Sequence, residues 1–306
     1  MQVQQQENFL VNSPFDLRDD RSYAAWREQK LAQYPQSLAE IMVDIENPHQ
    51  LNAAESAAIR RACQRANMAI YTIRGATVSR ANADKSLVAD LGHHFGLESL
   101  DTNLYADDDG ISALQVSSEK RQFEYIPYSN RPISWHTDGY YNSPEKTIRA
   151  MLLHCASPAA EGGENMIMDH EMLYLLMRDE NPRYIEALMQ PTVMTIPANV
   201  ENGVEIRPEQ SGPVFSVDAE TGHLHMRYTA RSRSIEWQQD ELTLAAVKCL
   251  EELLAADSPY IYRHRLQAGQ GIICNNVLHK RSGFKDDEQT GQQRLFFRAR
   301  YYDRVT

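Results

Sequence analysis

The segment from Ser134 to Asn142 contains a His-x-Asp pair, His136 and Asp138, surrounded by residue types that favour strands. On a strand, residues two apart project to the same face, so the His136 imidazole and the Asp138 carboxylate can bind one metal ion together. Such a pair also arises by chance. It therefore predicts half of a metal site and requires a third ligand from another part of the chain.

His279 is the candidate for this third ligand. It follows an apolar run at residues 271–276 and is followed by polar residues, as expected for a strand that ends at the mouth of a barrel. Two histidines and one carboxylate form the facial triad of non-haem Fe(II) oxygenases, which leaves coordination positions for a co-substrate and O2. The alternative is a histidine that only makes hydrogen bonds near a strand end.

The C-terminal run at residues 294–302 alternates, so that Arg294, Arg298 and Arg300 share one face of a predicted strand. One interpretation is an amphipathic edge strand with a solvated basic face. The other is that at least one arginine points into the fold and binds a carboxylate by two charge-assisted hydrogen bonds.

Aromatic residues cluster around the His-x-Asp pair. Six lie within residues 123–141: Phe123, Tyr125, Tyr128, Trp135, Tyr140 and Tyr141. Aromatic faces can hold a trimethylammonium cation, whereas the alternative is ordinary packing in the core or in a lid.

Composition restricts the class of protein. The 306 residues include 31 Lys and Arg against 42 Asp and Glu, a net charge of −11, which argues against a nucleic-acid ligand. No apolar run approaches the ~18 residues of a membrane span, and the N-terminal residues lack the features of a signal peptide. The sequence therefore predicts a cytoplasmic protein with no nucleic-acid or membrane partner and with four scattered, reduced cysteines.

Short apolar or alternating runs recur along the chain and predict strands. They lie at residues 68–73, 149–155, 165–169, 192–196, 214–217, 223–228, 271–276 and 294–302. Helices are predicted at residues 52–66, 82–95, 171–178 and 239–256. This pattern indicates a mainly β fold with flanking helices, a sandwich or barrel. Residues 1–50 are predicted to form a wrapping N-terminal extension with Trp26 and Tyr34 as anchors, and residues 51–306 a single domain.

Together these motifs resemble the TauD/TfdA (taurine dioxygenase) family of Fe(II)/2-oxoglutarate-dependent oxygenases, with γ-butyrobetaine hydroxylase-like features. The resemblance extends from about Ala54 to Tyr302. The motifs that carry it are Trp135-His136-Thr137-Asp138, the segment from Leu152 to Asn165 with Gly162-Gly163-Glu164, Asn276 to His279, and Arg294 to Arg298. It implies a double-stranded β-helix, or jelly roll, with flanking helices.

The resemblance also implies roles for single residues. Fe(II) would be bound by His136, Asp138 and His279, and Arg294 would pair with the distal carboxylate of 2-oxoglutarate. Asn165 stands where many relatives carry a Thr or Ser that contacts the co-substrate, and an amide can also donate to a carboxylate.

Substrate contacts are implied in the same way. Arg298 matches the position that contacts the substrate sulfonate in taurine dioxygenase, and a structural ion pair is its alternative. Tyr125, Tyr128 and Tyr140 are the candidate aromatic contacts.

The expected activity is hydroxylation of a small anionic or zwitterionic metabolite, of sulfonate, betaine or amino-acid type, with release of succinate and CO2. O2 and a small-molecule substrate are the expected partners, and association into a homo-oligomer is left open. Two alternatives remain: a non-catalytic jelly-roll ligand-binding or sensor protein, and a zinc hydrolase that uses the same triad.

Overall fold

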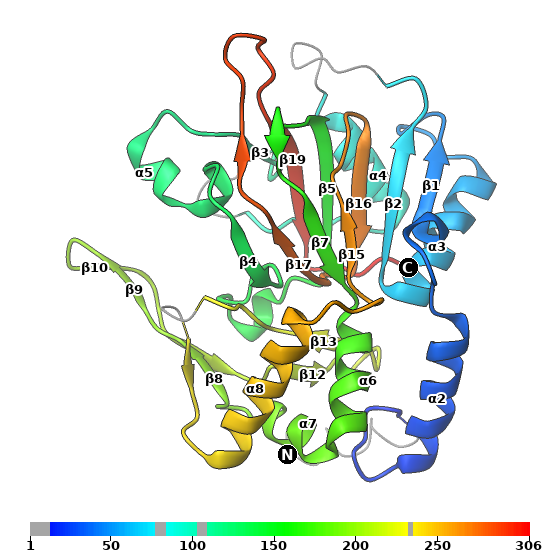
Figure 1. The fold of residues 1–306 in the computed structure, drawn as a ribbon, viewed down its shortest axis with the longest axis vertical. Helices are drawn as coiled ribbons and strands as arrows, with labels where there is room; N and C mark the ends of the chain where they lie inside the picture. Colours follow the sequence, from blue (N-terminus) through cyan, green and yellow to red (C-terminus); the bar gives the residue numbers. More distant parts are fainter. Residues whose placement is uncertain (1–12, 77–83, 103–108, 232–234) are drawn as a thin grey trace.

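Two β-sheets face each other at the centre of the computed structural model, which describes residues 13–76, 84–102, 109–231 and 235–306 (Figure 1). The large sheet has the strand order β1 (Met42–Ile45), β2 (Met68–Ile73), β16 (Gln270–Cys274), β5 (Ala150–Ser157), β19 (Leu295–Tyr301) and β3 (Ser112–Leu114). Its strands pair antiparallel except for β1 and β2, which are parallel. Every residue of β5 and β16 is buried, which explains why their sequences are almost continuously apolar.

The smaller of the two central sheets has four antiparallel strands. Their order is β15 (Tyr262–His264), β7 (Asn165–Met168), β17 (Leu278–Arg281) and β4 (Ile133–His136). Both candidate histidine ligands lie on this sheet. The fold is the jelly roll with flanking helices that the sequence predicts.

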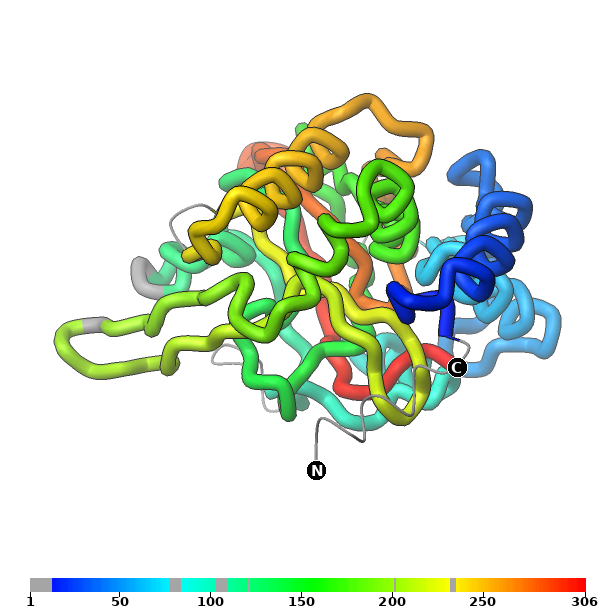
Figure 2. Tube along the Cα trace, turned by 90° about the horizontal axis from the view of Figure 1, so that it is seen from below, coloured from blue at the N-terminus to red at the C-terminus, as the bar shows by residue number. Residues whose placement is uncertain are grey.

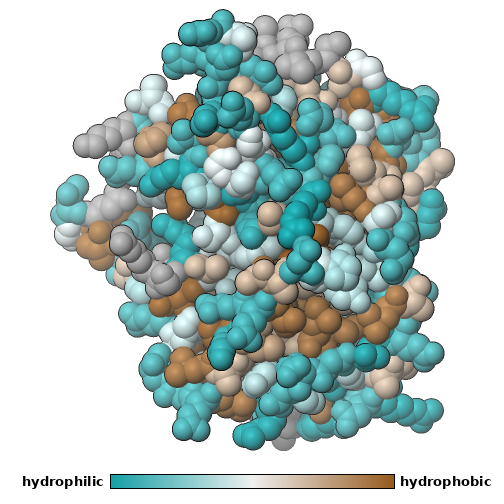
Figure 3. Space-filling view, viewed as in Figure 1, coloured by the Kyte–Doolittle hydropathy of each residue, from teal (hydrophilic) through white to brown (hydrophobic). Residues whose placement is uncertain are grey.

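Four minor sheets surround this core. They are β11 (Gln210–Gly212) with β8 (Met194–Ile196) and β14 (Glu236–Trp237), β12 (Phe215–Val217) with β13 (Leu224–Met226), β9 (Asn199–Glu201) with β10 (Val204–Arg207), and β6 (Glu161–Gly162) with β18 (Phe284–Lys285). The β9–β10 hairpin projects from the body of the molecule (Figure 2). Val200 and Val204 on it are 57% and 61% exposed, and hydrophobic colour marks the left edge of Figure 3, where Figure 1 places the hairpin.

Seven α-helices are described. They are α2 (Asp20–Gln33), α3 (Ala53–Ala66), α4 (Ser86–His94), α5 (Lys120–Glu124), α6 (His170–Glu180), α7 (Pro182–Leu188) and α8 (Glu241–Ala255), with 3-10 turns η1 (Leu38–Ile41), η2 (Ile126–Tyr128) and η3 (Pro144–Lys146). A capping box begins α3, because Asn52 Oδ1 accepts from the Glu55 amide while Glu55 accepts from the Asn52 amide. Among the described helices none is long and apolar enough to cross a membrane.

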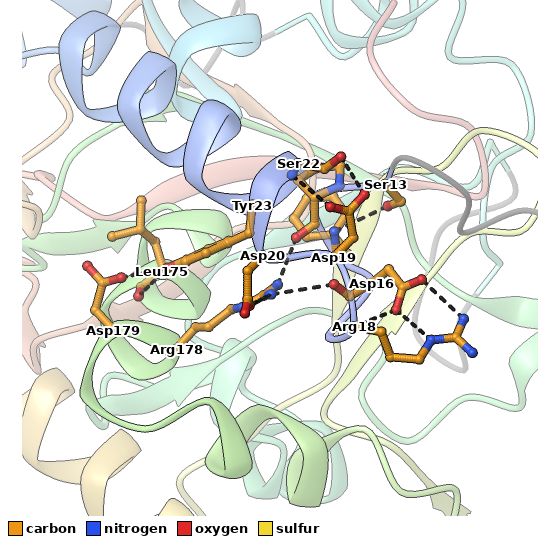
Figure 4. Close-up of polar contacts among 12 residues, drawn as sticks. Ser13, Asp16, Arg18, Asp19, Asp20, Ser22, Tyr23, Leu175, Arg178 and Asp179 are labelled. Carbon is orange, nitrogen blue, oxygen red and sulfur yellow. Dashed lines mark hydrogen bonds and ion pairs between the residues drawn. The ribbon is translucent and has the colours of Figure 1, made fainter.

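The N-terminal segment packs on α6. The guanidinium carbon of Arg178 in α6 lies 3.9 Å from the centroid of the Tyr23 ring, and Arg178 also donates to the Pro14 carbonyl. The Tyr23 hydroxyl donates to Asp179 at 2.7 Å (Figure 4). Lys30 of α2 reaches inward, 2.7 Å from Asp169 and 2.6 Å from Glu171.

The two aromatic residues predicted as anchors of this segment also pack. Trp26 contacts Phe15 at 5.3 Å between centroids, and Tyr34 is buried against Tyr260 and Tyr262. Strand β1, which belongs to the same N-terminal segment, forms one edge of the large sheet.

Candidate active site

Strands β4 and β17 bring two histidines directly opposite each other. His136 and His279 are cross-strand partners, and their ring centroids lie 4.2 Å apart. Asp138 follows two residues after His136, and one ligand atom from each of the three residues lies within 4.8 Å of the others. The two separate sequence motifs therefore form one cluster of three donors.

Both histidines are held in the tautomer that a metal ligand needs. The Nδ1–H of His136 donates to the Ser134 carbonyl and that of His279 to the Val277 carbonyl, each at 2.9 Å. This leaves the Nε2 lone pair of each ring free for an ion. Desolvation, reinforced by the neighbouring His279, lowers the pKa of His136 to about 3, so the ring is neutral near pH 7.

Asp138 supplies the negative charge of the cluster. Its Oδ1 accepts from Arg298 Nη1 at 3.2 Å, whereas its buried Oδ2 has no hydrogen-bond partner among the described residues. Burial opposes ionisation, but the charges of Arg298 and Arg300 outweigh it and hold the Asp138 pKa below its usual range. A buried, ionised oxygen without a partner beside two free imidazole nitrogens fits a divalent cation, and this donor set is that of non-haem Fe(II).

Asn276 positions Asp138, a role that the sequence did not disclose. Its Oδ1 accepts from the Asp138 amide at 2.8 Å, and its Nδ2 donates to the carbonyls of Asp138 and Ile148 at 2.9 and 2.7 Å. Asn276 has a left-handed φ of 49°, which Asn tolerates better than most residues. The only sequence signal was a polar residue at the end of an apolar run.

Strand β19 is not an edge strand, so the interpretation of a solvated basic face is wrong. It lies between β5 and β3, and Arg294 and Arg300 are each only 3% exposed. The three-residue strand β3, too short to be evident in the sequence, pairs with the outer edge of β19. The arginine face of β19 is turned towards groups inside the fold. Arg300 pairs with buried Asp101, while Arg298 pairs with Asp138.

Arg294 lies in an apolar setting without a carboxylate partner. Its guanidinium carbon is 3.9 Å from the Phe296 ring centroid and 5.2 Å from that of Phe284. No described carboxylate forms a salt bridge with it, and its buried Nε is unpaired. Burial lowers its pKa to about 9, and the charge of Arg281 adds to this shift. Such a cation fits a carboxylate that comes from a ligand.

Asn165 and Arg281 lie opposite each other on β7 and β17. The Asn165 Nδ2 and the Arg281 Nε are buried without a partner in the described chain. Arg281 also packs 4.7 Å from the Phe284 centroid and donates to the Ser129 carbonyl. The sequence analysis did not identify Arg281 as a site residue. Arg281 lies two residues after His279, and this spacing on a strand places both side chains on the same face, which could have indicated it.

The predicted aromatic contacts occupy different positions. Tyr140 lies edge-on to His136, with ring centroids 6.5 Å apart, and contacts Tyr141 at 5.1 Å. The Tyr141 hydroxyl accepts from Arg300 at 2.9 Å. Tyr128 is buried in the hydrophobic core, and Tyr125 packs against that core. The structure thus brings Tyr140 beside the metal cluster.

The profile of the taurine catabolism dioxygenase TauD, TfdA family matches residues 29–300. The chain belongs to this family. It is 30% identical over 235 residues to a uridine-5'-phosphate dioxygenase of a Streptomyces species, covering 72% of this chain and 80% of that protein. A protein of the same name from an Amycolatopsis species is 27% identical over 157 residues, which is 50% of this chain and 55% of that protein.

Among solved structures, an asparagine oxygenase in complex with Fe(II), 3-hydroxyasparagine and succinate superposes with a TM-score of 0.57 at 15% identity, covering 85% of this chain and 93% of that one. The protein is an Fe(II)- and 2-oxoglutarate-dependent dioxygenase that acts on a small molecule with O2. This assignment favours the oxygenase interpretation over the sensor protein and the zinc hydrolase.

The four cysteines play no part in the cluster. Cys63, Cys155 and Cys274 are buried, and burial raises the pKa of the Cys155 and Cys274 thiols to about 12. All four are free thiols, as the sequence predicts, and burial keeps Cys155 and Cys274 protonated.

Proposed function

We propose that this dioxygenase oxidises a small anionic metabolite and that uridine-5'-phosphate is the first substrate to test. The oxidation of one C–H bond to C–OH would be coupled to the conversion of 2-oxoglutarate and O2 into succinate and CO2. The observation that carries the proposal is the cluster of His136, Asp138 and His279 with free donor atoms, in a fold that also buries Arg281 and Arg294 with unpaired Nε atoms. The names of the two related dioxygenases support the nucleotide as substrate.

In this proposal His136, Asp138 and His279 hold Fe(II). When bound, the iron activates O2 and binds the 2-oxo-acid end of the co-substrate. The backbone carbonyls at Ser134 and Val277 fix the two imidazoles in the ligand tautomer. The clamp from Asn276 fixes the backbone at Asp138, so the three donors are oriented before the ion arrives.

Arg294 and Asn165 would bind the distal end of 2-oxoglutarate, and Arg281 would be a third contact. All three have a buried nitrogen without a partner in the described chain, and the distal carboxylate of 2-oxoglutarate offers acceptors for these nitrogens. Fixing the co-substrate at both ends positions its 2-oxo-acid group over the iron ligands.

On the substrate side we propose Arg298 as a polar contact and Tyr140, Tyr125 and Tyr128 as the aromatic wall. Arg298 has a buried Nε that the ion pair with Asp138 does not use. The position of Tyr140 beside His136 supports a role in covering the site and excluding water.

The domain division is part of the same proposal: residues 51–306 form the dioxygenase domain, and residues 1–50 form an N-terminal extension. Of this extension, residues 13–41 pack on the domain and strand β1 joins its large sheet. We place the reaction in the cytoplasm. Light scattering of the purified protein tests whether copies of the chain associate.

Purified protein supplied with Fe(II), 2-oxoglutarate, ascorbate and O2 tests the proposal. With uridine-5'-phosphate we expect succinate to form in a one-to-one ratio with nucleotide consumed, and His279→Ala to abolish both. A panel of sulfonates, betaines and amino acids is assayed in parallel. Succinate formation stimulated by one of those compounds but not by the nucleotide would overturn the choice of substrate. Absence of succinate with every compound, from folded and iron-loaded protein, would overturn the proposed activity.

A further inference from the structure

Two more arginines reach the segment that follows Asp138, and they come from the minor sheets. Arg207 ends the projecting β9–β10 hairpin, and its guanidinium carbon lies 5.8 Å from the Tyr141 ring centroid. Arg227 follows β13 and donates through Nε to the Tyr140 carbonyl at 2.7 Å. The hairpin and β13 therefore meet the two tyrosines beside the metal cluster.

Neither cation has a carboxylate partner within salt-bridge distance in the described part of the chain. Arg207 donates to the carbonyls of Pro197 and Pro208, at 2.6 and 2.8 Å. Burial lowers the pKa of Arg207, and it lowers that of Arg227 to about 10, with repulsion from Arg207 adding to the shift. In a protein with a net charge of −11, two neighbouring arginines without a carboxylate form a local positive charge that favours an anionic ligand.

The two arginines differ in what they can still bind. Arg227 donates to four backbone carbonyls, those of Tyr140, Met194, Gly212 and Gln210, so its donors are used within the protein. Arg207 is only partly buried, and two proline carbonyls hold its guanidinium in place without neutralising it. Arg207 can thus receive a ligand from solvent, and Arg227 supports the strands beneath it.

Arg298, the arginine that contacts the metal cluster, already shares its charge with Asp138. Arg207, by contrast, contacts the ring of Tyr141, forms no salt bridge with a described carboxylate and is partly exposed. Arg207 is therefore the arginine beside these tyrosines that can still bind an anion.

We propose that Arg207 forms an anion subsite that binds a phosphate monoester on the substrate. The inference rests on the proposed function and makes the substrate class specific. Arginine matches the oxygens of a phosphate group by paired charge-assisted hydrogen bonds. Three contacts connect the metal cluster with Arg207: His136 to Tyr140 at 6.5 Å, Tyr140 to Tyr141 at 5.1 Å and Tyr141 to Arg207 at 5.8 Å. A substrate that reaches both ends must be elongated and carry its anionic group at one end, and a nucleoside monophosphate has this form.

The experiment compares the protein with Arg207→Gln, Arg207→Lys and the control Arg61→Gln, which removes an exposed arginine from α3. Calorimetry measures binding of uridine-5'-phosphate, uridine and inorganic phosphate to protein loaded with Mn(II) and 2-oxoglutarate. We expect Arg207→Gln to weaken nucleotide binding by about tenfold to a hundredfold, the range for loss of a charge-assisted hydrogen bond. Uridine binding should change by less than about twofold, and Arg207→Lys should restore part of the nucleotide affinity.

Each outcome decides the inference. Equal weakening of nucleotide and uridine, or nucleotide binding unchanged in Arg207→Gln, overturns it. Nucleotide binding that is weakened in Arg207→Gln, with uridine binding unchanged and with Arg61→Gln like the unaltered protein, supports it. Because calorimetry needs no turnover, nucleotide binding without succinate formation would contradict the proposed function while the subsite stands. Thermal melting of each variant verifies that it is folded.

Discussion

The oxygen Oδ2 of Asp138 is the most informative single atom of the site. It is buried, it belongs to an ionised carboxylate, and the described chain offers it no hydrogen bond. Proteins seldom leave such an atom without a partner unless a ligand or ion provides one. The residues around it accordingly act in two groups, those that bind the ion and those that hold the ligands.

Asn276 belongs to the second group, and its replacement by Ala should affect both stability and iron binding. The substitution leaves the amide and carbonyl of Asp138 and the carbonyl of Ile148 unpaired in a buried place. We expect a loss of roughly 2–4 kcal/mol in the free energy of unfolding. Urea denaturation measures this loss, and titration with Fe(II) should show weaker binding by the folded fraction. Unaltered iron affinity would show that Asn276 stabilises the fold without positioning Asp138.

Arg294 and Arg281 can be tested with two co-substrates that differ at one end. For Arg294→Gln we expect about tenfold to a hundredfold weaker binding of 2-oxoglutarate, because a buried charge-assisted pair is lost. The five-carbon 2-oxovalerate lacks the distal carboxylate. It should bind the unaltered protein more weakly than 2-oxoglutarate does, and Arg294→Gln should hardly change its affinity. Arg281→Gln should show the same selectivity with a smaller effect. Calorimetry with Mn(II)-loaded protein measures both acids, and equal weakening of the two would exclude a contact to the distal carboxylate.

At the scale of elements, strand pairing explains why the metal ligands were predictable and other features were not. The His-x-Asp spacing and the apolar run before His279 are local patterns, and β4 and β17 need only pair to bring them together. The buried side chain of Arg294 contacts groups distant in sequence, the Leu114 carbonyl in β3 and the ring of Phe284, so no local pattern revealed its burial. The sequence analysis also did not predict α2, α7 and the β9–β10 hairpin. Helix α2 lacks an apolar stripe, and the hairpin buries little of its surface.

Helix α2 is attached through a buried ion cluster, and this attachment can be tested. Lys30 is 7% exposed and contacts both Asp169 and Glu171. Burial opposes its charge, but the two carboxylates outweigh this and raise its pKa. Lys30→Met leaves the buried Asp169 and the partly buried Glu171 without their cation and should cost about 3–5 kcal/mol of unfolding free energy.

The matched control for Lys30 is Arg27→Gln on the same helix. Arg27 pairs with Asp179 at the surface, with 42% of its side chain exposed, so its loss should cost at most about 1 kcal/mol. Urea denaturation of both variants measures the difference. Equal costs would show that the buried cluster is not what attaches α2.

At the scale of the whole molecule, the buried histidines set the response to acid. Desolvation lowers the pKa of His154 in β5 to about 4, and that of His225 in β13 to about 3 with a contribution from His170. Below the ordinary histidine pKa of about 6.5 the unfolded chain takes up protons that the folded protein does not bind. Stability is therefore present above about pH 6.5 and is lost as pH falls towards 4.

We expect each of these histidines to contribute up to about 1.4 kcal/mol per pH unit to this loss. In His154→Gln the fall in unfolding free energy between pH 7 and pH 5 should be smaller than in the unaltered protein. Glutamine can still accept from the Tyr71 hydroxyl, which contacts His154 at 2.9 Å. Urea denaturation at pH 7, 6 and 5 measures the slope, and an unchanged slope in the variant would contradict the assignment.

The segment from His279 to Arg294 carries one of the three proposed iron ligands and both arginines proposed for the co-substrate within sixteen consecutive residues. Arg207, proposed for the substrate phosphate, lies instead on the projecting β9–β10 hairpin, which contributes none of the residues proposed for iron or 2-oxoglutarate. A change in the length or charge of this hairpin can therefore alter which metabolite binds while the residues proposed for iron and 2-oxoglutarate stay unchanged. Relatives that act on different metabolites are then expected to differ in this loop.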